Sequence, residues 1–462
     1  MSIYLEGPRA PVTDEVTAFD LPVTGEIPSE LEGRWLRNGP NPHGTVDSAH
    51  HHWFLGDGMV HGVRLRGGRA EGYRNRWVRG GRLAAALGEA MRAAELWIDG
   101  QRRYRRIPAI SAALVRGDTT VWAKGFGTTD RAGRIPATPD TIYSICSISK
   151  LFTAVELMQQ WERGTVALDA PIERYLPWAR LADDPRDSVP ITLRGLLTHS
   201  AGLPREADFP YWTGPDFAFP SQAQVRVAIR EQTPLYPAST TWQYSNLGLT
   251  LVGETVEAVS GTPYAEYVDA NILGPLGLDD TRAGIPAQLY GQQMAVGWGA
   301  LEANGTRPEV GLFDPAGITP AAGFTASVAD LAKFASWTFR VASSGEEEVL
   351  RPSTLREMQR VHYISPDWET SWGLGFSVRQ EGGTTVVGHG GACPGYRSVL
   401  MLAPSEGMGV AVAMNAMDDP GGIARGIAAL VKARGEAAPF DPDAPPLGIR
   451  FIDGSLIVVC RE

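Results

Sequence analysis

The segment Thr141-Ile-Tyr-Ser-Ile-Cys-Ser147-Ile-Ser-Lys150-Leu-Phe-Thr-Ala154 places a serine three residues before a lysine, at the start of an apolar-striped stretch. That stripe predicts a helix over residues 147–163. Three residues are nearly one helical turn, so the Ser147 hydroxyl and the Lys150 amine should lie on one face. A serine becomes a nucleophile when a base takes its proton, and a desolvated lysine can be that base. The alternative is an ordinary surface Ser–Lys pair.

A second motif, Tyr244-Ser245-Asn246, comes directly before another apolar segment that predicts a helix over residues 247–260. A tyrosine in this place could relay a proton between nucleophile and leaving group. Asn246 could orient a substrate amide or the lysine. The alternative is a loop tyrosine followed by a helix-capping asparagine.

A third motif, Gly388-His389-Gly390-Gly391-Ala392, lies at the end of a strand predicted over residues 384–388. Glycines there allow a substrate carbonyl to approach the backbone and leave an N–H as an oxyanion donor. The alternative is a tight bend at a sheet edge.

In this order the three motifs resemble the serine β-lactamase and penicillin-binding superfamily, most closely class C β-lactamases and family VIII carboxylesterases. The resemblance covers roughly residues 82–433 and includes Leu168-Asp-Ala-Pro-Ile172, Pro275-Leu-Gly-Leu-Asp-Asp-Thr281 and Trp372-Gly-Leu-Gly-Phe376. It implies an α+β fold (an α/β sandwich): a β-lactamase-like antiparallel sheet flanked by terminal helices, plus a mostly helical domain. Strand-like segments near both chain ends around a helical middle agree with one mixed sheet.

Carried over residue by residue, the resemblance makes Ser147 the nucleophile and Lys150 its partner base. Tyr244 becomes the second general acid/base, and Asn246 a substrate-orienting residue. The backbone N–H groups of Ser147 and Ala392 would form the oxyanion hole.

The third motif departs from the β-lactamase pattern, because Lys-Thr-Gly is replaced by His389, Gly390 and Gly391. In the family that lysine and threonine help to hold the carboxylate of a β-lactam, whereas His-x-Gly is familiar among the esterases. We therefore expect a serine hydrolase for small, short-acyl carboxylic esters. The alternatives are a β-lactamase or D-Ala-D-Ala carboxypeptidase, and a non-catalytic binding protein. His389 is also a rival candidate for the base.

Three residues near these motifs are given no catalytic role. His199, in Leu-Leu-Thr-His199-Ser-Ala-Gly, is interpreted as a loop-structuring residue. Cys146 is interpreted as a packed small hydrophobe, and Cys393 is expected to line the same pocket. With Cys460 these are the three cysteines of the chain, too few and too scattered for a disulfide framework or a zinc site.

The first eighty residues differ from the rest. Leu31-Glu-Gly-Arg-Trp-Leu-Arg-Asn-Gly-Pro-Asn-Pro42 and His51-His-Trp-Phe-Leu-Gly-Asp-Gly-Met-Val-His61 resemble the opening of carotenoid cleavage oxygenases. Those enzymes close a seven-bladed propeller over an iron held by four histidines, and eighty residues are too few to close one. His50, His51, His52 and His61 do not match the iron ligands. We expect a β-rich, non-catalytic extension, and no metal or cofactor.

These observations predict three parts: residues 1–80, the fused fragment; 81–437, the hydrolase domain with a helical insertion over about 150–325; and 438–462, an extension with a β-hairpin. A boundary at Gly80-Gly81 marks the change from strand-like to helical patterning.

Composition limits the partners. The chain is 43% hydrophobic and 20% charged, which is ordinary for a globular protein. A net charge of −10 argues against a nucleic-acid-binding face, and no apolar run is long enough for a membrane span. The N-terminus shows no secretory pattern, so we expect a cytoplasmic protein whose partner is a small-molecule ester. The oligomeric state stays open.

Overall fold

A computed structural model describes residues 17–19, 21, 27–39, 59–77, 81–181, 188–207, 209, 211–435, 448–452 and 455–459. The three histidines His50, His51 and His52 lie outside the described residues. The chain divides into two compact units, Met1–Trp97 with Arg425–Glu462, and Ile98–Ala424. The boundaries expected at residues 80 and 437 stay predictions.

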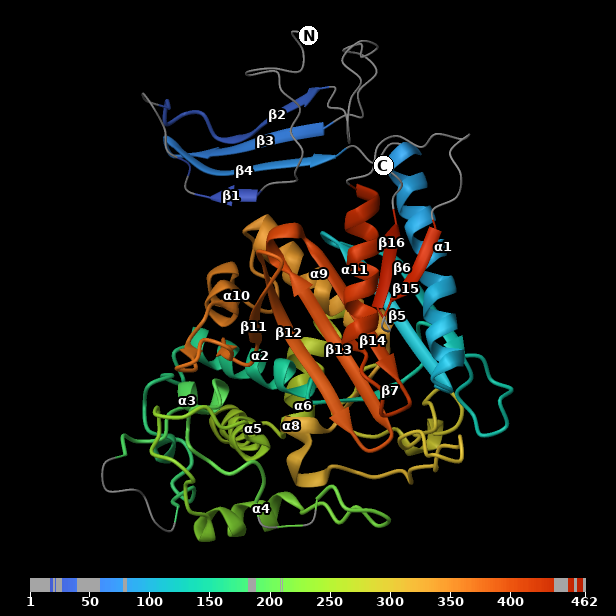
Figure 1. The fold of residues 1–462 in the computed structure, drawn as a ribbon. Coiled ribbons are helices and arrows are strands. Elements are labelled where there is room, and N and C mark those ends of the chain that lie inside the picture. Colours follow the sequence, from blue (N-terminus) through green and yellow to red (C-terminus); the bar gives the residue numbers. More distant parts are fainter. Residues whose placement is uncertain are drawn as a thin grey trace. The chain divides into compact units, whose positions relative to one another are not determined.

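An eight-stranded antiparallel sheet is the centre of the unit Ile98–Ala424 (Figure 1). The strands follow the order β6-β5-β14-β13-β12-β11-β10-β9. Their bounds are β5 Ala109–Arg116, β6 Thr119–Gly127, β9 Tyr363–Ile364, β10 Ser371–Trp372, β11 Ser377–Glu381, β12 Thr384–Cys393, β13 Tyr396–Ala403 and β14 Met408–Met414. The α+β class is confirmed.

The two ends of this unit meet in the middle of the sheet. Strand β5 pairs with β14, with Ile110 opposite Met414. All seven residues of β14 are buried, so both faces of the sheet are covered at this strand. Helix α9, Val328–Ser344, packs on β5, β6 and β14. Its Ser327 side chain caps the helix by accepting a hydrogen bond from Asp330 N.

One strand is longer than its sequence indicates. The prediction ended it at residue 388, but β12 continues to Cys393 and pairs with β13, with Gly391 opposite Ser398. The third motif therefore lies inside a strand, and the edge-bend alternative is wrong. Pairing with β13 holds this glycine-rich stretch extended despite its weak strand propensity.

A helical region lies between the short strands β7, Tyr143–Cys146, and β8, Phe324–Ala326, which pair with each other. Its α-helices are α2 Ser149–Glu162, α3 Leu193–Leu197, α4 Gln222–Ala228, α5 Asn246–Ser260, α6 Tyr264–Val268, α7 Gly274–Leu276 and α8 Thr319–Ala322. Helix α2 packs against α5 and α8. Phe152 of α2 lies 5.0 Å from Phe324 and 4.8 Å from Phe334, between ring centroids, which ties this region to α9. Helix α10, Pro352–Gln359, follows α9.

The other unit is rich in strands, as the sequence predicts. Its four-stranded sheet has the order β1-β4-β3-β2. The strands are β1 Thr17–Phe19, β2 Gly33–Gly39, β3 Met59–Arg66 and β4 Arg69–Trp77. His61 Nδ1 lies 2.6 Å from the Tyr73 hydroxyl, across β3 and β4.

Two helices and a hairpin complete the description. Helix α1 is Gly81–Tyr104, α11 is Gly421–Gly435, and the predicted C-terminal hairpin is β15 Gly448–Ile452 with β16 Ser455–Val459. No helix in the described part of the chain has both the length and the apolar content needed to cross a bilayer.

Candidate active site

Ser147 and Lys150 lie together where β7 passes into α2. Lys150 Nζ is 3.2 Å from Ser147 Oγ. It donates hydrogen bonds to Asn246 Oδ1 and to the Ala321 carbonyl, both at 2.7 Å. Both of these oxygens can only accept, so they use the two N–H donors of a neutral amine. The lone pair of the neutral Lys150 amine is then free to accept the proton of the Ser147 hydroxyl.

Burial favours the neutral form of the Lys150 amine. The Lys150 side chain is completely buried, and this desolvation holds its pKa well below the usual range. The carboxylate of Glu206 opposes the shift and Arg205 adds to it. The alternative of a surface Ser–Lys pair is therefore wrong.

Tyr244 lies beside this pair, in the loop before α5. Lys150 Nζ is 4.9 Å and Arg205 Cζ 5.0 Å from the centroid of its ring. Burial raises the pKa of the phenol, while a hydrogen bond with Ser147 and the charge of Arg205 lower it. The hydroxyl thus keeps its proton at neutral pH and contacts the candidate nucleophile.

Asn246 is the first residue of α5 but does not cap it. Ser245 is the cap, because its Oγ accepts a hydrogen bond from Gly248 N at 2.9 Å. The Asn246 side chain is free to reach Lys150 through Oδ1 and to donate from Nδ2 to Glu206 Oε1. Glu206 belongs to no motif, and sequence analysis missed it.

His389, on β12, is buried and lies near the ring of Tyr244. Its Nδ1 lies 2.6 Å from the Gly390 carbonyl, and its ring centroid is 6.2 Å from that of Tyr244. Burial and the charge of Lys150 lower the pKa of His389 to about 3. Such an imidazole is neutral at pH 7 and a poor proton acceptor, which weakens its case as the base.

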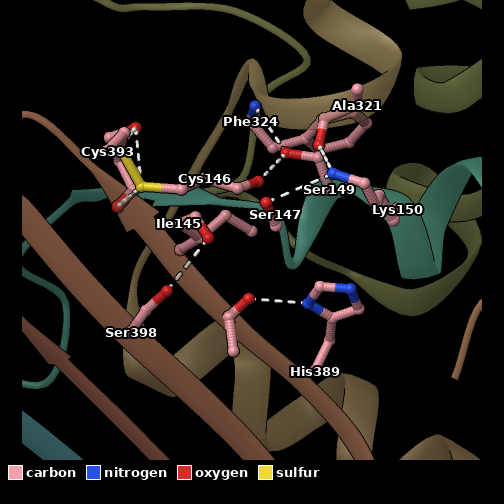
Figure 2. The surroundings of a disulfide bond; sticks show 12 residues. Ile145, Cys146, Ser147, Ser149, Lys150, Ala321, Phe324, His389, Cys393 and Ser398 are labelled. Carbon is pink, nitrogen blue, oxygen red and sulfur yellow. Dashed lines mark hydrogen bonds between the residues drawn. A yellow bond between two sulfur atoms is a disulfide. The ribbon is translucent and has the colours of Figure 1, made fainter. Parts of the chain in front are cut away.

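The backbone of β12 lies directly against β7 at Gly391. A Cβ atom there would collide with Ser398 Oγ and the Ile145 carbonyl. Ser398 Oγ donates to that same carbonyl at 2.9 Å (Figure 2). The close approach brings Ala392 and Ser147, the two expected oxyanion donors, onto neighbouring segments.

A disulfide joins the same two segments, which the sequence analysis did not expect. Cys146 and Cys393 are bonded, with an S–S distance of 1.97 Å (Figure 2). Both side chains are buried, and Cys146 is packed as predicted, but it is also bonded to Cys393 rather than being only a small hydrophobe. The link could not be read from spacing, because the two positions are 247 residues apart.

His199 shapes the loop that carries Tyr244. Its Nδ1 accepts a hydrogen bond from Ser245 N at 3.2 Å, and its ring lies 4.4 Å from that of Tyr244. It has a left-handed backbone with φ of 59°. These contacts agree with the predicted loop-structuring role. Among the described residues, no group of three or more His, Cys, Asp or Glu side chains is arranged to hold a metal ion.

Comparisons with known proteins match this architecture. The family model described as Beta-lactamase matches residues 93–433. The structure of the octameric penicillin-binding protein homologue from Pyrococcus abyssi superposes with a TM-score of 0.66 and 29% identity, covering 75% of this chain and 78% of that one. Esterase EstB of Burkholderia gladioli is 32% identical over 200 residues, 39% of this chain and 48% of the esterase.

The N-terminal residues match a different kind of protein. A carotenoid cleavage oxygenase of Mycobacterium tuberculosis is 66% identical over 90 residues, 20% of this chain. The chain spans only 18% of that oxygenase. The family model described as Retinal pigment epithelial membrane protein matches residues 9–168. The expected oxygenase-like fragment at the start of the chain is confirmed.

Proposed function

The chain belongs to the beta-lactamase family of serine hydrolases, with an N-terminal fragment of a carotenoid cleavage oxygenase, and on that premise we propose that it hydrolyses small, short-acyl carboxylic esters through an acyl-enzyme on Ser147. The observation that carries the proposal is the completely buried Lys150 amine, 3.2 Å from Ser147 Oγ and held by two carbonyl acceptors.

Acylation begins with attack of Ser147 Oγ on the ester carbonyl carbon. The neutral Lys150 amine accepts the hydroxyl proton as the new C–O bond forms. The carbonyl oxygen becomes an oxyanion, which the N–H groups of Ser147 and Ala392 stabilise. When the intermediate collapses, the alkoxide leaves and takes a proton from Tyr244, whose hydroxyl contacts Ser147. Lys150 returns a proton to Tyr244.

Deacylation repeats these steps with water as the nucleophile. Lys150 and Tyr244 together accept one proton from water, and the hydroxide oxygen adds to the acyl carbon. Collapse expels Ser147 Oγ, which regains its proton from the same pair. The products are the free acid and the restored Ser147 hydroxyl.

The neutral His389 favours esters over β-lactams and peptides. β-Lactamases have a lysine at this position, whose charge helps to hold a substrate carboxylate. With a pKa lowered to about 3, His389 supplies no such charge at pH 7. The test is turnover of p-nitrophenyl acetate by the wild type, by Ser147→Ala and by a control, Ser343→Ala, on α9 outside the site. Retained turnover in Ser147→Ala would rule the proposal out.

A second candidate comes from the similarity to a penicillin-binding protein homologue: β-lactamase or D-Ala-D-Ala carboxypeptidase activity. Hydrolysis of nitrocefin at a rate that rivals ester hydrolysis would favour it. A non-catalytic binding protein would leave Ser147 unlabelled by a fluorophosphonate probe, whereas either hydrolase should react.

A further inference from the structure

The lysine that contacts Ser147 is connected to a carboxylate through one side-chain amide. Asn246 Oδ1 accepts from Lys150 Nζ at 2.7 Å, and Asn246 Nδ2 donates to Glu206 Oε1. Trp212 Nε1 donates to the same Glu206 oxygen at 2.8 Å. An asparagine amide can flip, so a carboxylate that only accepts hydrogen bonds fixes which end faces which neighbour.

We infer that Glu206 is a positioning residue that holds the Asn246 amide with its oxygen toward Lys150 and places a negative charge behind that lysine. This inference rests on the proposed function, because it concerns the same Lys150 as the base of acylation.

The location of Glu206 suits both tasks. Its side chain is 16% exposed, and Arg205 Nε, 3.8 Å from Oε1, is a distant and largely solvated partner. Glu206 Oε2 is buried and has no hydrogen-bond partner among the described residues. The carboxylate charge is therefore poorly screened, and it acts on the buried Lys150.

The direction of the effect on Lys150 follows from charge. Burial lowers the pKa of Lys150, and the negative charge of Glu206 partly restores it by stabilising the ammonium form. Within the part of the chain that the structure describes, the charged and titratable side chains that act on or contact Lys150 are Glu206, Arg205, Tyr244, His199 and His389. Glu206 is the one carboxylate in this group, so no other member can replace its charge.

Two substitutions separate the two tasks. Glu206→Gln keeps the length and an acceptor oxygen for Asn246 but removes the charge. Its alkaline plateau of kcat/KM should stay within roughly threefold of the wild type. Its rising acid limb should move to lower pH by about one unit, because Lys150 loses its proton more easily.

Glu206→Asp keeps the charge but shortens the side chain. Its acid limb should stay near that of the wild type, while the plateau falls roughly tenfold because Asn246 is no longer held. The matched control is Glu257→Gln on α5, a glutamate bonded to Arg226 and Gln222 that does not act on Lys150. Glu257→Gln should change neither the pH of the acid limb nor the alkaline plateau of kcat/KM.

The measurement is the pH dependence of kcat/KM for p-nitrophenyl acetate in the full chain, with thermal unfolding to verify folding. An acid limb of Glu206→Gln that coincides with the wild type would overturn the inference, as would a full plateau in Glu206→Asp. Failure of the proposed function is distinguishable, because it would appear first as activity retained in Ser147→Ala.

Discussion

The α-carbons of Cys146 and Cys393 lie 5.8 Å apart, joined by a disulfide between two positions 247 residues apart in the sequence. Cys146 directly precedes Ser147, and Cys393 directly follows Ala392. The link therefore fastens together the two segments whose N–H groups we propose as oxyanion donors.

Loss of this link should reduce both stability and activity. Cys393→Ser should lower the free energy of unfolding by about 2–5 kcal/mol, the usual range for a native disulfide. kcat for p-nitrophenyl acetate should fall roughly tenfold, because the donor spacing is less constrained. Thermal melts without reductant and steady-state rates measure the two effects.

The double variant Cys146→Ser/Cys393→Ser is the control. It should lose about as much stability as either single variant, since each removes the same bond. Two free thiols titrated in the unfolded, unreduced wild type, beyond Cys460, would show that the bond does not form in solution. Disulfides are rare in a reducing cytosol, so this titration also bears on the predicted cytoplasmic localisation.

Gly391 should tolerate no side chain. Gly391→Ala would push a methyl group into Ser398 Oγ and the Ile145 carbonyl, next to the nucleophile. We expect at least a hundredfold loss of kcat/KM, of the order seen when an oxyanion donor is lost. Gly390→Ala is the matched comparison, because its nearest neighbour would be the Ser398 carbonyl at 3.8 Å. Similar kinetics for the two variants would contradict the close approach.

The pH–rate profile should identify the base. If Lys150 is the base, kcat/KM rises with pH as the lysine loses its proton. A His389 base, with its pKa lowered to about 3, would already be deprotonated at neutral pH and would give no such rise there. Lys150→Arg should abolish acylation, since arginine stays protonated at working pH. His389→Asn should keep the shape of the profile. An active Lys150→Arg enzyme would instead assign the base to another residue.

Glu156 should make stability depend on pH. This glutamate of α2 is completely buried, and burial raises its pKa well above the usual range. Below the unfolded pKa, near 4.3, both states hold the proton and the group costs nothing. Above it, only the unfolded state ionises, so the free energy of unfolding should fall by about 1.4 kcal/mol per pH unit up to the folded pKa.

The isosteric Glu156→Gln removes that ionisation. It should melt at a higher temperature than the wild type at pH 7 and at nearly the same temperature at pH 4. Equal melting temperatures at both values would show that Glu156 is ionised in the folded protein.

Much of the site was accessible from sequence because its signals are local. Ser147 and Lys150 share one turn at a helix start, Tyr244 lies two residues before the apolar helix α5, and Asn246 begins that helix. Glu206 carries no such signal, because its contact with Asn246 is made from a loop 40 residues away. In the sequence, Glu206 is visible only as one acidic residue shortly after the loop that contains His199.

The sheet, like the site, combines features that the sequence predicts with features that it does not. The individual strands follow from alternating or continuous apolar runs, and the family resemblance supplies their common sheet. The extension of β12 through Gly390 and Gly391 was not predictable, because glycine favours a break and only pairing with β13 overrides it. The disulfide depends on that same extension, which brings Cys393 to Cys146.

The pairing of β5 with β14 has a consequence for synthesis on the ribosome. Ile110 emerges early, yet its partner Met414 is added only after nearly all of the rest of the unit. Until then the apolar β5 has β6 on one edge and nothing on the other, a state open to aggregation. Completion of this sheet should therefore wait until β14 has been synthesised and should be slow, as in other folds dominated by distant contacts. Truncation before residue 408 should yield an insoluble chain.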